Sequence, residues 1–515
     1  MKVSRFHAPG LRWSVLFGFS LIWGCVLWWG VAVHGLGTSR DSVEYLFTSL
    51  SLTRGDGFVS FLGQPYILWP PLYPILLALV QTAGIADPLR AALVLQLITF
   101  ILLAALGAWL FRRIFQRNFA LAFLANALAG TGIALTAQFQ AVGSDYLFIA
   151  LTLGMVYLCV AYINSARTGT LWLMVVVSAL AMLQRYIGIT VLLTCAWIVF
   201  HYSRTGIWEK VKRLLLLGMS VIPVGVWAFS LPAEAVLRDD PSSLFENIYW
   251  FTFSILSWFF PEAELYGHPV RLQFGMWALW LGIFFCGVIF WKFRKPQDTA
   301  MTEMPLFTFG MIYTIVLIVI ASLSSFNSLD GRFASPIFIP LVTLVAGTFE
   351  RILAFEFLRT KALRMAAHVF AYAAMLAAII LSGFLSVTSL NVHHRSGQGY
   401  TSLDWSENDV MDYWLAYQPA EDYLVFSNYP AGVAVQTWHV ALSSPRRTAH
   451  PNAGEAVIPL DTYLPSLFAP GKESYLVWIE PNEYTHVYSV DDLRSIVKIE
   501  TVYENEDGGV YRILP

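Results

Sequence analysis

Charged residues are scarce in this chain of 515 residues. Asp, Glu, Lys and Arg make up only 13% of it, about half of the usual fraction in a soluble domain, and 57% of the residues are hydrophobic. The net charge is −2 and no basic run occurs, so the sequence indicates no nucleic-acid partner. This composition argues against a soluble protein and favours an integral membrane protein.

Cysteine is scarce as well. All four cysteines lie within apolar stretches, so neither a disulfide scaffold nor a zinc site is indicated. They are Cys25, Cys159, Cys195 and Cys286. A small-residue cleavage site is also lacking after the first apolar stretch, which is long, and we therefore predict a retained helix there.

Long apolar stretches fill most of the chain up to residue 390. About eleven of them approach the ~20 residues that an α-helix needs to span a bilayer. They are residues 13–34, 89–111, 118–138, 146–163, 170–184, 187–202, 214–230, 273–291, 305–326, 333–349 and 366–389. Two further apolar pieces, residues 67–83 and 244–260, are interrupted by proline and charge. We expect these two to lie on the membrane surface or to re-enter without crossing.

The distribution of Lys and Arg predicts the orientation of these spans. If residues 67–83 and 244–260 do not cross the membrane, eighteen basic residues lie in the loops on the amino-terminal side of the membrane, and seven lie in the loops on the opposite side. The seven are Arg40, Arg54, Arg90, Arg185, Arg238, Arg271 and Arg332. Because basic loops remain in the cytoplasm, the amino terminus is predicted to be cytoplasmic. A crossing at residues 67–83 would place Arg112, Arg113 and Arg117 outside, against this rule.

The composition changes after residue 389. Residues 390–515 hold 17 of the 34 acidic residues, and the topology places them outside the cytoplasm. A helix that begins at the N-cap serine Ser406 is expected there, together with three strands over residues 423–426, 475–479 and 508–514. We therefore predict an all-α polytopic transmembrane domain, residues 1–389, followed by a small extracytoplasmic α/β domain, residues 390–515. This second domain lacks a glycine-rich nucleotide-binding loop.

The segment from Thr38 to Leu79 carries the strongest functional signal. The carboxylate of Asp41 follows the first apolar stretch, and an ionisable group at a bilayer edge is costly, which indicates a functional site. The apolar residues within 42–54 have the spacing of an amphipathic helix, and such a helix suits the membrane interface. The later run Trp69-Pro70-Pro71-Leu72-Tyr73-Pro74 is expected to shape the cavity near Asp41 as a scaffold.

This segment resembles the first external loop of the GT-C superfamily of membrane glycosyltransferases, in the bacterial branch related to the PMT and lipid A aminoarabinose transferases. The resemblance covers most of residues 1–390. It implies transfer of a hexosyl or pentosyl group from a polyprenyl-phosphate donor to a lipid, glycan or protein acceptor. The reaction would take place on the extracytoplasmic face of the bacterial plasma membrane, in the cell envelope. An acidic residue at this position of the loop serves the superfamily as catalytic base or metal ligand, which places that role on Asp41.

Two further carboxylates are candidates. Glu44 lies one helical turn beyond Asp41 and could assist it, although Asp41 could equally be a helix cap and Glu44 its capping-box partner. Asp145 occupies the second external loop, where members of the superfamily often carry a second acidic residue. Asp145 is therefore a candidate second acidic site, with an N-cap as the alternative. The resemblance does not decide whether a divalent cation is the cofactor.

Arginines in two other external loops are the candidates for binding the donor phosphate. Arg185 lies between two apolar stretches with almost no loop, where it needs an anionic partner such as a lipid phosphate or a structural carboxylate, unless it snorkels to the surface. In relatives of the superfamily an arginine near the later Asp330-Gly331-Arg332 loop approaches the donor phosphate, which implies the same role for Arg332. Asp330 is expected to pair with Arg332 or to cap the following helix.

Two other functions are compatible with the same sequence. A transporter or flippase of a lipid-linked substrate would also have many spans and few intramembrane charges. Such proteins usually show internal repeats, which are lacking here, and the ionisable residues of this chain gather at one membrane face. The other alternative is a non-catalytic membrane subunit whose carboxy-terminal domain recruits partners.

Overall fold

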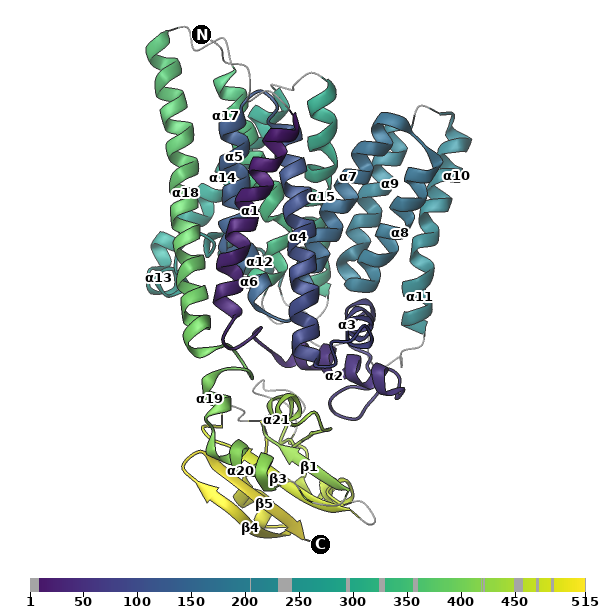
Figure 1. The fold of residues 1–515 in the computed structure, drawn as a ribbon, viewed down its shortest axis with the longest axis vertical. Coiled ribbons are helices and arrows are strands. Elements are labelled where there is room, and N and C mark those ends of the chain that lie inside the picture. Colours follow the sequence, from purple (N-terminus) through teal and green to yellow (C-terminus); the bar gives the residue numbers. More distant parts are fainter. Residues whose placement is uncertain are drawn as a thin grey trace. The chain divides into compact units, whose positions relative to one another are not determined.

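The computed structural model describes residues 9–514 except 204, 230–242, 293–296, 324–328, 355–359, 418, 420–421, 449–456, 469–471 and 483–485. The chain divides into two compact units (Figure 1). The first comprises Met1–Gly30, Ile67–Tyr73 and Val94–Val392. The second comprises Val31–Tyr66, Pro74–Leu93 and His393–Pro515, so it joins the residues after the first long helix to the carboxy-terminal region.

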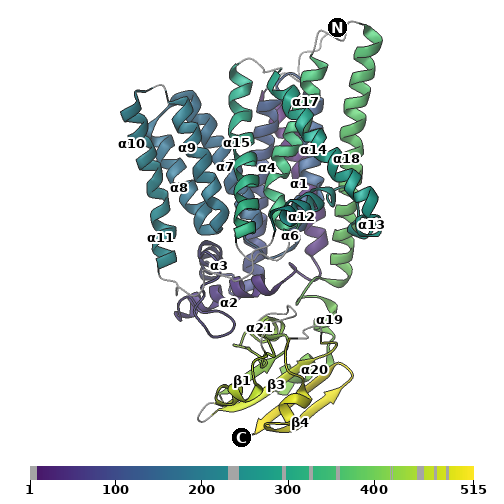
Figure 2. The same ribbon diagram turned by 180° about the vertical axis from the view of Figure 1, so that it is seen from behind.

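Helices build the first unit. They are α1 (Pro9–Val31), α4 (Pro88–Ile114), α5 (Phe119–Thr131), α6 (Ile133–Gln140), α7 (Asp145–Ser165), α8 (Thr168–Gln184), α9 (Ile189–Tyr202), α10 (Ile207–Gly218), α11 (Ile222–Phe229), α12 (Leu244–Leu256), α13 (Glu262–Gly267), α14 (Pro269–Lys292), α15 (Gln297–Leu323), α16 (Gly331–Ala334), α17 (Phe338–Leu353) and α18 (Lys361–Ser396). Helices α7, α8, α9 and α10 pack as neighbours, and α15 contacts both α7 and α17 (Figure 2).

Nine helical segments among the described residues are long and apolar enough to cross a membrane. They are Gly10–Val31, Pro88–Ile114, Phe119–Gln140, Asp145–Ser165, Ile207–Phe229, Pro269–Phe290, Thr302–Leu323, Gly331–Leu353 and Lys361–Ser396. The apolar helices Thr168–Gln184 and Tyr186–Tyr202 are shorter, so the total of eleven spans stays a prediction. The polytopic membrane architecture itself is confirmed.

The two interrupted apolar pieces form short helices. The first gives α3 (Leu72–Thr82), of 11 residues, and the second gives α12, of 13 residues. At 1.5 Å per residue these helices extend about 16 and 20 Å, well short of the ~30 Å hydrocarbon core. Their length agrees with the expectation that neither piece crosses. Arg238, one of the seven basic residues expected in the opposite loops, lies outside the described residues.

A buried ion pair joins α15 and α17 in the first unit. Nη2 of Arg351 on α17 lies 2.6 Å from Oε2 of Glu303 on α15, and the two side chains are 3% and 1% exposed. The guanidinium carbon of Arg351 also lies 3.4 Å from the centre of the Phe290 ring. Arg351, which the sequence places in a cytoplasmic loop, is therefore a helix residue whose charge is neutralised inside the protein.

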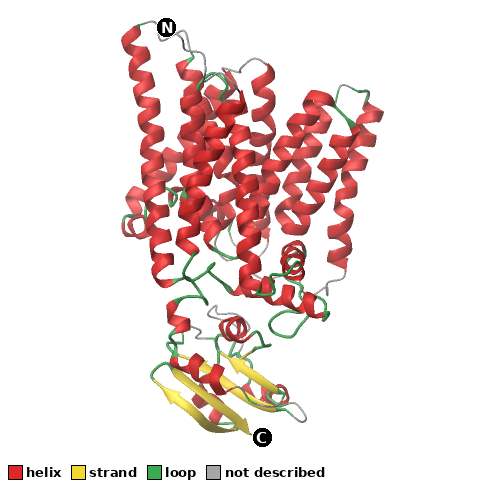
Figure 3. Cartoon of the chain, in the orientation of Figure 1, coloured by secondary structure: helices red, strands yellow, loops and turns green. Residues whose placement is uncertain are grey.

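The second unit contains every strand of the described structure (Figure 3). Besides α2 (Arg40–Arg54) and α3, its elements are α19 (Leu403–Ser406), α20 (Asp409–Tyr417), β1 (Tyr423–Ser427), α21 (Pro430–Thr437), β2 (Leu442–Ser443), β3 (Glu473–Ile479), α22 (Val490–Arg494), β4 (Lys498–Asn505) and β5 (Gly508–Leu514). The sheet order is β2-β1-β3-β5-β4. Strand β1 pairs parallel with β2 and β3, while β5 pairs antiparallel with β3 and β4.

The three strands that the sequence predicts are confirmed, and β2 and β4 add to them. The tight turn before β5 requires Gly508, whose φ is +124°. The predicted helix over residues 406–417 begins later, at Asp409, and the residue that caps it is not Ser406. The side chain of Asn408 instead accepts a hydrogen bond from the Met411 amide at 3.0 Å.

Backbone hydrogen bonds join the first external loop to the carboxy-terminal region within the second unit. The Tyr400 amide donates to the Thr38 carbonyl at 3.2 Å, and the Ala441 amide donates to the Phe61 carbonyl at 3.1 Å. Helix α2 packs against α21. The loop and the carboxy-terminal sheet are therefore parts of one compact body.

Candidate active site

The amino terminus of α2 carries the first group of candidate residues. Ser39 is the N-cap, and its hydroxyl accepts from the Ser42 amide while the Ser42 hydroxyl accepts from the Ser39 amide. Because Ser39 and Ser42 form the capping box themselves, neither Asp41 nor Glu44 caps this helix. The alternative readings of Asp41 as the cap and of Glu44 as the capping-box partner were therefore wrong. The helix also begins at Arg40, two residues earlier than predicted.

Helix α2 is buried to an unexpected degree. Every residue from 42 to 49 is buried, including both faces of the helix. The sequence predicted an amphipathic helix with one face in contact with the membrane interface. Protein surrounds α2 instead, because the second unit packs α21 and the loop around it.

Glu44 is the most unusual carboxylate of this group. It is 5% exposed, and its Oε2 atom has no hydrogen-bond partner among the described residues. Burial raises the pKa of Glu44 from 4.5 to about 7; the charge of Arg40 lowers this pKa and that of Asp41 raises it further. A carboxyl group with a pKa near neutrality can take up or hold a proton at physiological pH.

Replacing Glu44 by glutamine should change how stability depends on pH. Because the folded chain holds the Glu44 proton up to about pH 7 and the unfolded chain loses it near 4.5, wild-type stability should fall as pH rises between these values. The amide of the E44Q variant cannot ionise, so this variant should be more stable than wild type above pH 7, by up to about 3 kcal/mol. Thermal unfolding from pH 5 to 8 measures this difference. The exposed Glu264→Gln variant should give no such trend, and parallel curves for E44Q and wild type would contradict the burial effect.

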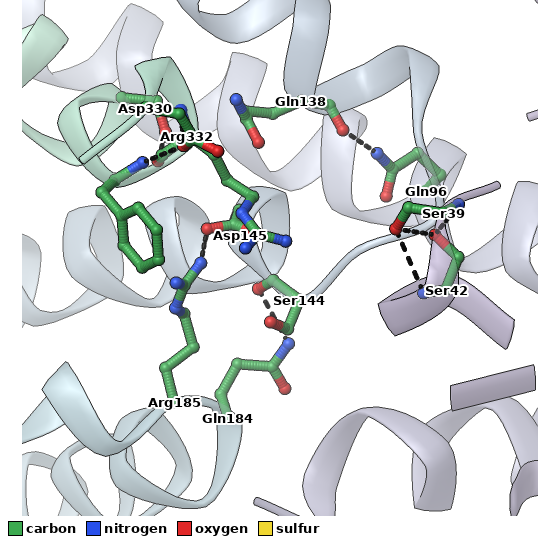
Figure 4. Close-up of polar contacts among 12 residues, drawn as sticks. Ser39, Ser42, Gln96, Gln138, Ser144, Asp145, Gln184, Arg185, Asp330 and Arg332 are labelled. Carbon is green, nitrogen blue, oxygen red and sulfur yellow. Dashed lines mark hydrogen bonds and ion pairs between the residues drawn. The ribbon is translucent and has the colours of Figure 1, made fainter. Parts of the chain in front are cut away.

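The second group of candidates lies in the first unit, where three loops meet (Figure 4). Arg185, at the end of α8, forms an ion pair with Asp145 through Nη1 and Oδ1. Arg332, on α16, approaches the other oxygen of the same carboxylate, with 4.0 Å between Nε and Oδ2. The Asp145 side chain is 5% exposed, that of Arg185 is 12% exposed and that of Arg332 is 34% exposed. Two guanidinium groups thus share one carboxylate.

Local structure fixes Asp145 and Arg185. Asp145 is the first residue of α7, after the N-cap Ser144, so its alternative reading as the cap itself was wrong. The Gln184 side chain donates to the Ser144 carbonyl at 2.9 Å, which ties the end of α8 to the start of α7. The turn from α8 into α9 is so tight that a Cβ on Gly188 would lie 2.2 Å from the Ala181 carbonyl oxygen. Only glycine therefore fits there.

Arg332 is positioned by a helix cap and an aromatic ring. The Asp330 side chain accepts from the Arg332 amide at 2.9 Å and from the Phe333 amide at 3.4 Å, so Asp330 caps α16, one of its two expected roles. The guanidinium carbons of Arg185 and Arg332 lie 5.3 and 5.2 Å from the centre of the Phe333 ring. The Tyr313 hydroxyl donates to the Phe333 carbonyl at 2.9 Å. Sequence reasoning missed Phe333, because nothing local marks a ring shared by two distant arginines.

The charges of this cluster suit an anion better than a metal ion. Arg185 and Arg332 both approach Asp145 with their guanidinium groups, and guanidinium groups are the side chains best suited to bind a phosphate or carboxylate ligand. A divalent cation would be repelled by both arginines. Within the described ranges no group of three or more His, Cys, Asp or Glu side chains is placed to hold a metal ion. The residues around Asp145 therefore do not fit a metal site.

The structure brings together three of the five predicted residues: Asp145, Arg185 and Arg332. Asp41 and Glu44 lie together on α2 in the second unit. The pairing of Arg185 with a carboxylate is one of the alternatives left open for it. The Trp69–Pro74 run is partly buried, with Pro70, Pro71 and Tyr73 inside the protein. Its scaffold role stays a prediction.

No family model matches the sequence, and no curated protein matches it. Solved structures do. The crystal structure of ArnT from Cupriavidus metallidurans in the apo state superposes with a TM-score of 0.61 at 14% identity, over 98% of each chain. The crystal structure of ArnT bound to undecaprenyl phosphate gives a TM-score of 0.57 at 14% identity, over 97% of this chain and 98% of that one. The chain thus has the fold of ArnT, and the GT-C fold expected from the Thr38–Leu79 segment is confirmed.

Proposed function

We propose that this integral membrane protein is a glycosyltransferase that moves a sugar from a polyprenyl-phosphate donor to an acceptor at the extracytoplasmic surface of the bacterial plasma membrane. The observation that carries the proposal is the convergence of two arginines, Arg185 and Arg332, on the carboxylate of Asp145. The fold adds support, because ArnT, which has the same fold, was solved with undecaprenyl phosphate. The distribution of basic loops supports a cytoplasmic amino terminus.

In this proposal Arg185 and Arg332 bind the donor phosphate. A guanidinium group carries five N–H donors and can donate two parallel hydrogen bonds to phosphate oxygens. Asp145 would hold the two arginines in position and limit their mutual repulsion before the donor arrives. When the bond between the anomeric carbon and the phosphate oxygen breaks, negative charge grows on that oxygen, and the arginines would stabilise it.

Asp41 is the proposed base, assisted by Glu44. An acceptor oxygen would attack the anomeric carbon of the donor sugar, the bond from that carbon to the phosphate oxygen would break, and Asp41 would take the acceptor proton. The products are the glycosylated acceptor and polyprenyl phosphate. Ser39 rather than the half-buried Asp41 caps α2, so the capping of this helix does not depend on the Asp41 carboxylate. The raised pKa of Glu44 would let it receive the proton next.

Transfer from radiolabelled polyprenyl-phosphate sugars in reconstituted vesicles tests this function. The purified chain should form labelled product with at least one donor when crude extracytoplasmic lipid and glycan acceptors are supplied. Movement of the intact labelled donor across the vesicle membrane, without product, would instead identify a flippase. Neither product nor movement with hexosyl and pentosyl donors would favour a non-catalytic subunit and contradict the proposal.

A further inference from the structure

A group of three sulfur atoms lies between two helices of the first unit. Met155 and Cys159 are four residues apart on α7, which places their side chains on the same face of that helix. Cys195 belongs to α9, which packs against α7. At 1.5 Å per residue, Cys159 lies about 21 Å along α7 from Asp145, so the group is separate from the proposed donor site.

Cys159 contacts both of the other sulfur atoms. Its thiol donates to Sδ of Met155 at 3.6 Å, and its Sγ atom lies 3.9 Å from Sγ of Cys195. All three side chains are 0% exposed. A metal ion at the centre of three sulfur atoms, with bonds of ~2.3 Å, holds neighbouring sulfurs ~4.0 Å apart. The two separations in the protein are therefore close to those of a trigonal three-sulfur metal site.

The ligand set selects the class of metal. Within the described parts of the chain no third His, Cys, Asp or Glu side chain joins the two cysteines as a metal ligand, so the set is two thiols and one thioether. Structural zinc sites take four ligands, which this set does not supply. Thiolate and thioether sulfurs are soft ligands that select Cu(I). The sulfur group thus fits a soft monovalent cation.

A monovalent cation also suits the apolar surroundings of the sulfur atoms. The residues next to the cysteines on α7 and α9 that face the interior are buried and apolar, among them Val156, Val160, Ile198 and Val199. An uncompensated charge among them would be costly. When Cu⁺ binds the two thiols and the thioether, one thiol loses its proton to water, so one thiolate balances the metal charge. The complex is then neutral, and no electron is transferred.

Polar side chains lead from the protein surface toward the sulfur atoms. Tyr162 lies one turn beyond Cys159 on α7, and its hydroxyl is 2.6 Å from Oγ of Ser203. Nη1 of Arg213 donates to the same hydroxyl at 2.8 Å. Arg213 also pairs with Glu209, whose side chain is 46% exposed. This row of groups gives the metal ion and the released proton a polar route that ends one helical turn from Cys159.

We propose that Met155, Cys159 and Cys195 form a binding site for one Cu(I) ion. The inference goes beyond the proposed glycosyl transfer and does not depend on it. The ion bridges α7, which begins at Asp145, and α9, which begins shortly after Arg185. It therefore fixes to one another the two helices that carry the proposed donor-binding residues at or near their first residues.

Competition with a copper chelator tests the site. Full-length protein with Cys25→Ser, which removes the exposed thiol, is equilibrated with Cu(I), ascorbate and bathocuproine disulfonate without oxygen. One Cu(I) per chain should stay bound. C159S or C195S should weaken this binding by about 100-fold or more, because loss of a direct ligand costs more than the ~10–100-fold that an outer-shell partner costs. M155L should weaken it by about 10-fold, because the thioether is an uncharged ligand.

The matched controls are C286S and M174L, which change a half-buried cysteine of α14 and a buried methionine of α8. Both should bind Cu(I) as the Cys25→Ser protein does. Equal Cu(I) affinities in C159S and C286S would overturn the site. Thermal unfolding of each variant shows whether it is folded.

X-ray absorption at the copper edge decides without any change to the three sulfur residues. Copper in the Cys25→Ser protein should have three sulfur neighbours, and nitrogen or oxygen neighbours in their place would contradict the proposal. Copper is supplied both during expression and to the purified protein, so that slow entry does not hide the site. A chain that retains no copper by either route would also overturn the inference. Bound copper without transfer activity would instead contradict the proposed function and leave the metal site standing.

Discussion

Asp41→Asn should lower the rate of sugar transfer by about 10²–10⁴-fold, the range that a positioned general base contributes. The amide has the shape of the carboxylate but cannot accept the acceptor proton. The fold should survive, because the Ser39–Ser42 pair caps α2 and Asp41 does not. Single-turnover transfer from a radiolabelled polyprenyl-phosphate sugar in vesicles measures the effect, with thermal unfolding as the check on folding.

The matched control for this variant is Asp56→Asn. Asp56 is exposed and lies in the same external loop, just after the end of α2, so the change in net charge is the same. D56N should transfer at the wild-type rate. A well-folded D41N protein that transfers as fast as D56N would remove Asp41 from the mechanism and leave Glu44 as the candidate base.

Arg185→Gln should produce the second large effect, a loss of about 10²-fold in affinity for the polyprenyl-phosphate donor, as two charge-assisted hydrogen bonds would provide. A structural role for Arg185 predicts a different result. Removing one partner of a buried pair destabilises a protein by about 3–5 kcal/mol, because the other charge remains unpaired. Donor affinity and thermal unfolding must therefore be measured on the same preparations.

The double variant Asp145→Asn with Arg185→Gln separates these two roles. It removes both charges of the buried pair, so it should recover most of the stability lost in R185Q. Donor affinity should stay low if Arg185 binds phosphate. Recovery of both stability and donor affinity in the double variant would show that the pair is structural only. R332Q provides a comparison, because Arg332 is 4.0 Å from Asp145 and more exposed, so it should weaken donor binding with little loss of stability.

The sequence predicted correctly what depends on local patterns. Long apolar runs gave the helices, and alternation gave β1, β3 and β5 within a residue or two of their ends. Local patterns failed where neighbours in space decide. The pattern of residues 42–54 predicted an amphipathic helix at the membrane interface, yet α2 is enclosed by α21 and the loop around it. The sequence placed Arg351 in a loop, yet Glu303 on another helix neutralises the charge of Arg351 inside the protein.

By itself the sequence determined that this is a polytopic membrane protein of the GT-C fold and which carboxylates and arginines are candidates for its chemistry. Composition and periodicity carry the membrane architecture, because each span or strand follows from its own residues, whereas the GT-C fold and the roles of the candidate residues came from the resemblance of the Thr38–Leu79 segment. Only the tertiary structure decided that Asp145 is shared by Arg185 and Arg332 and that Glu44 is buried beside Arg40. Charge pairing depends on distance in space, and loops far apart in the chain acquire their partners only when the helices and the sheet have packed.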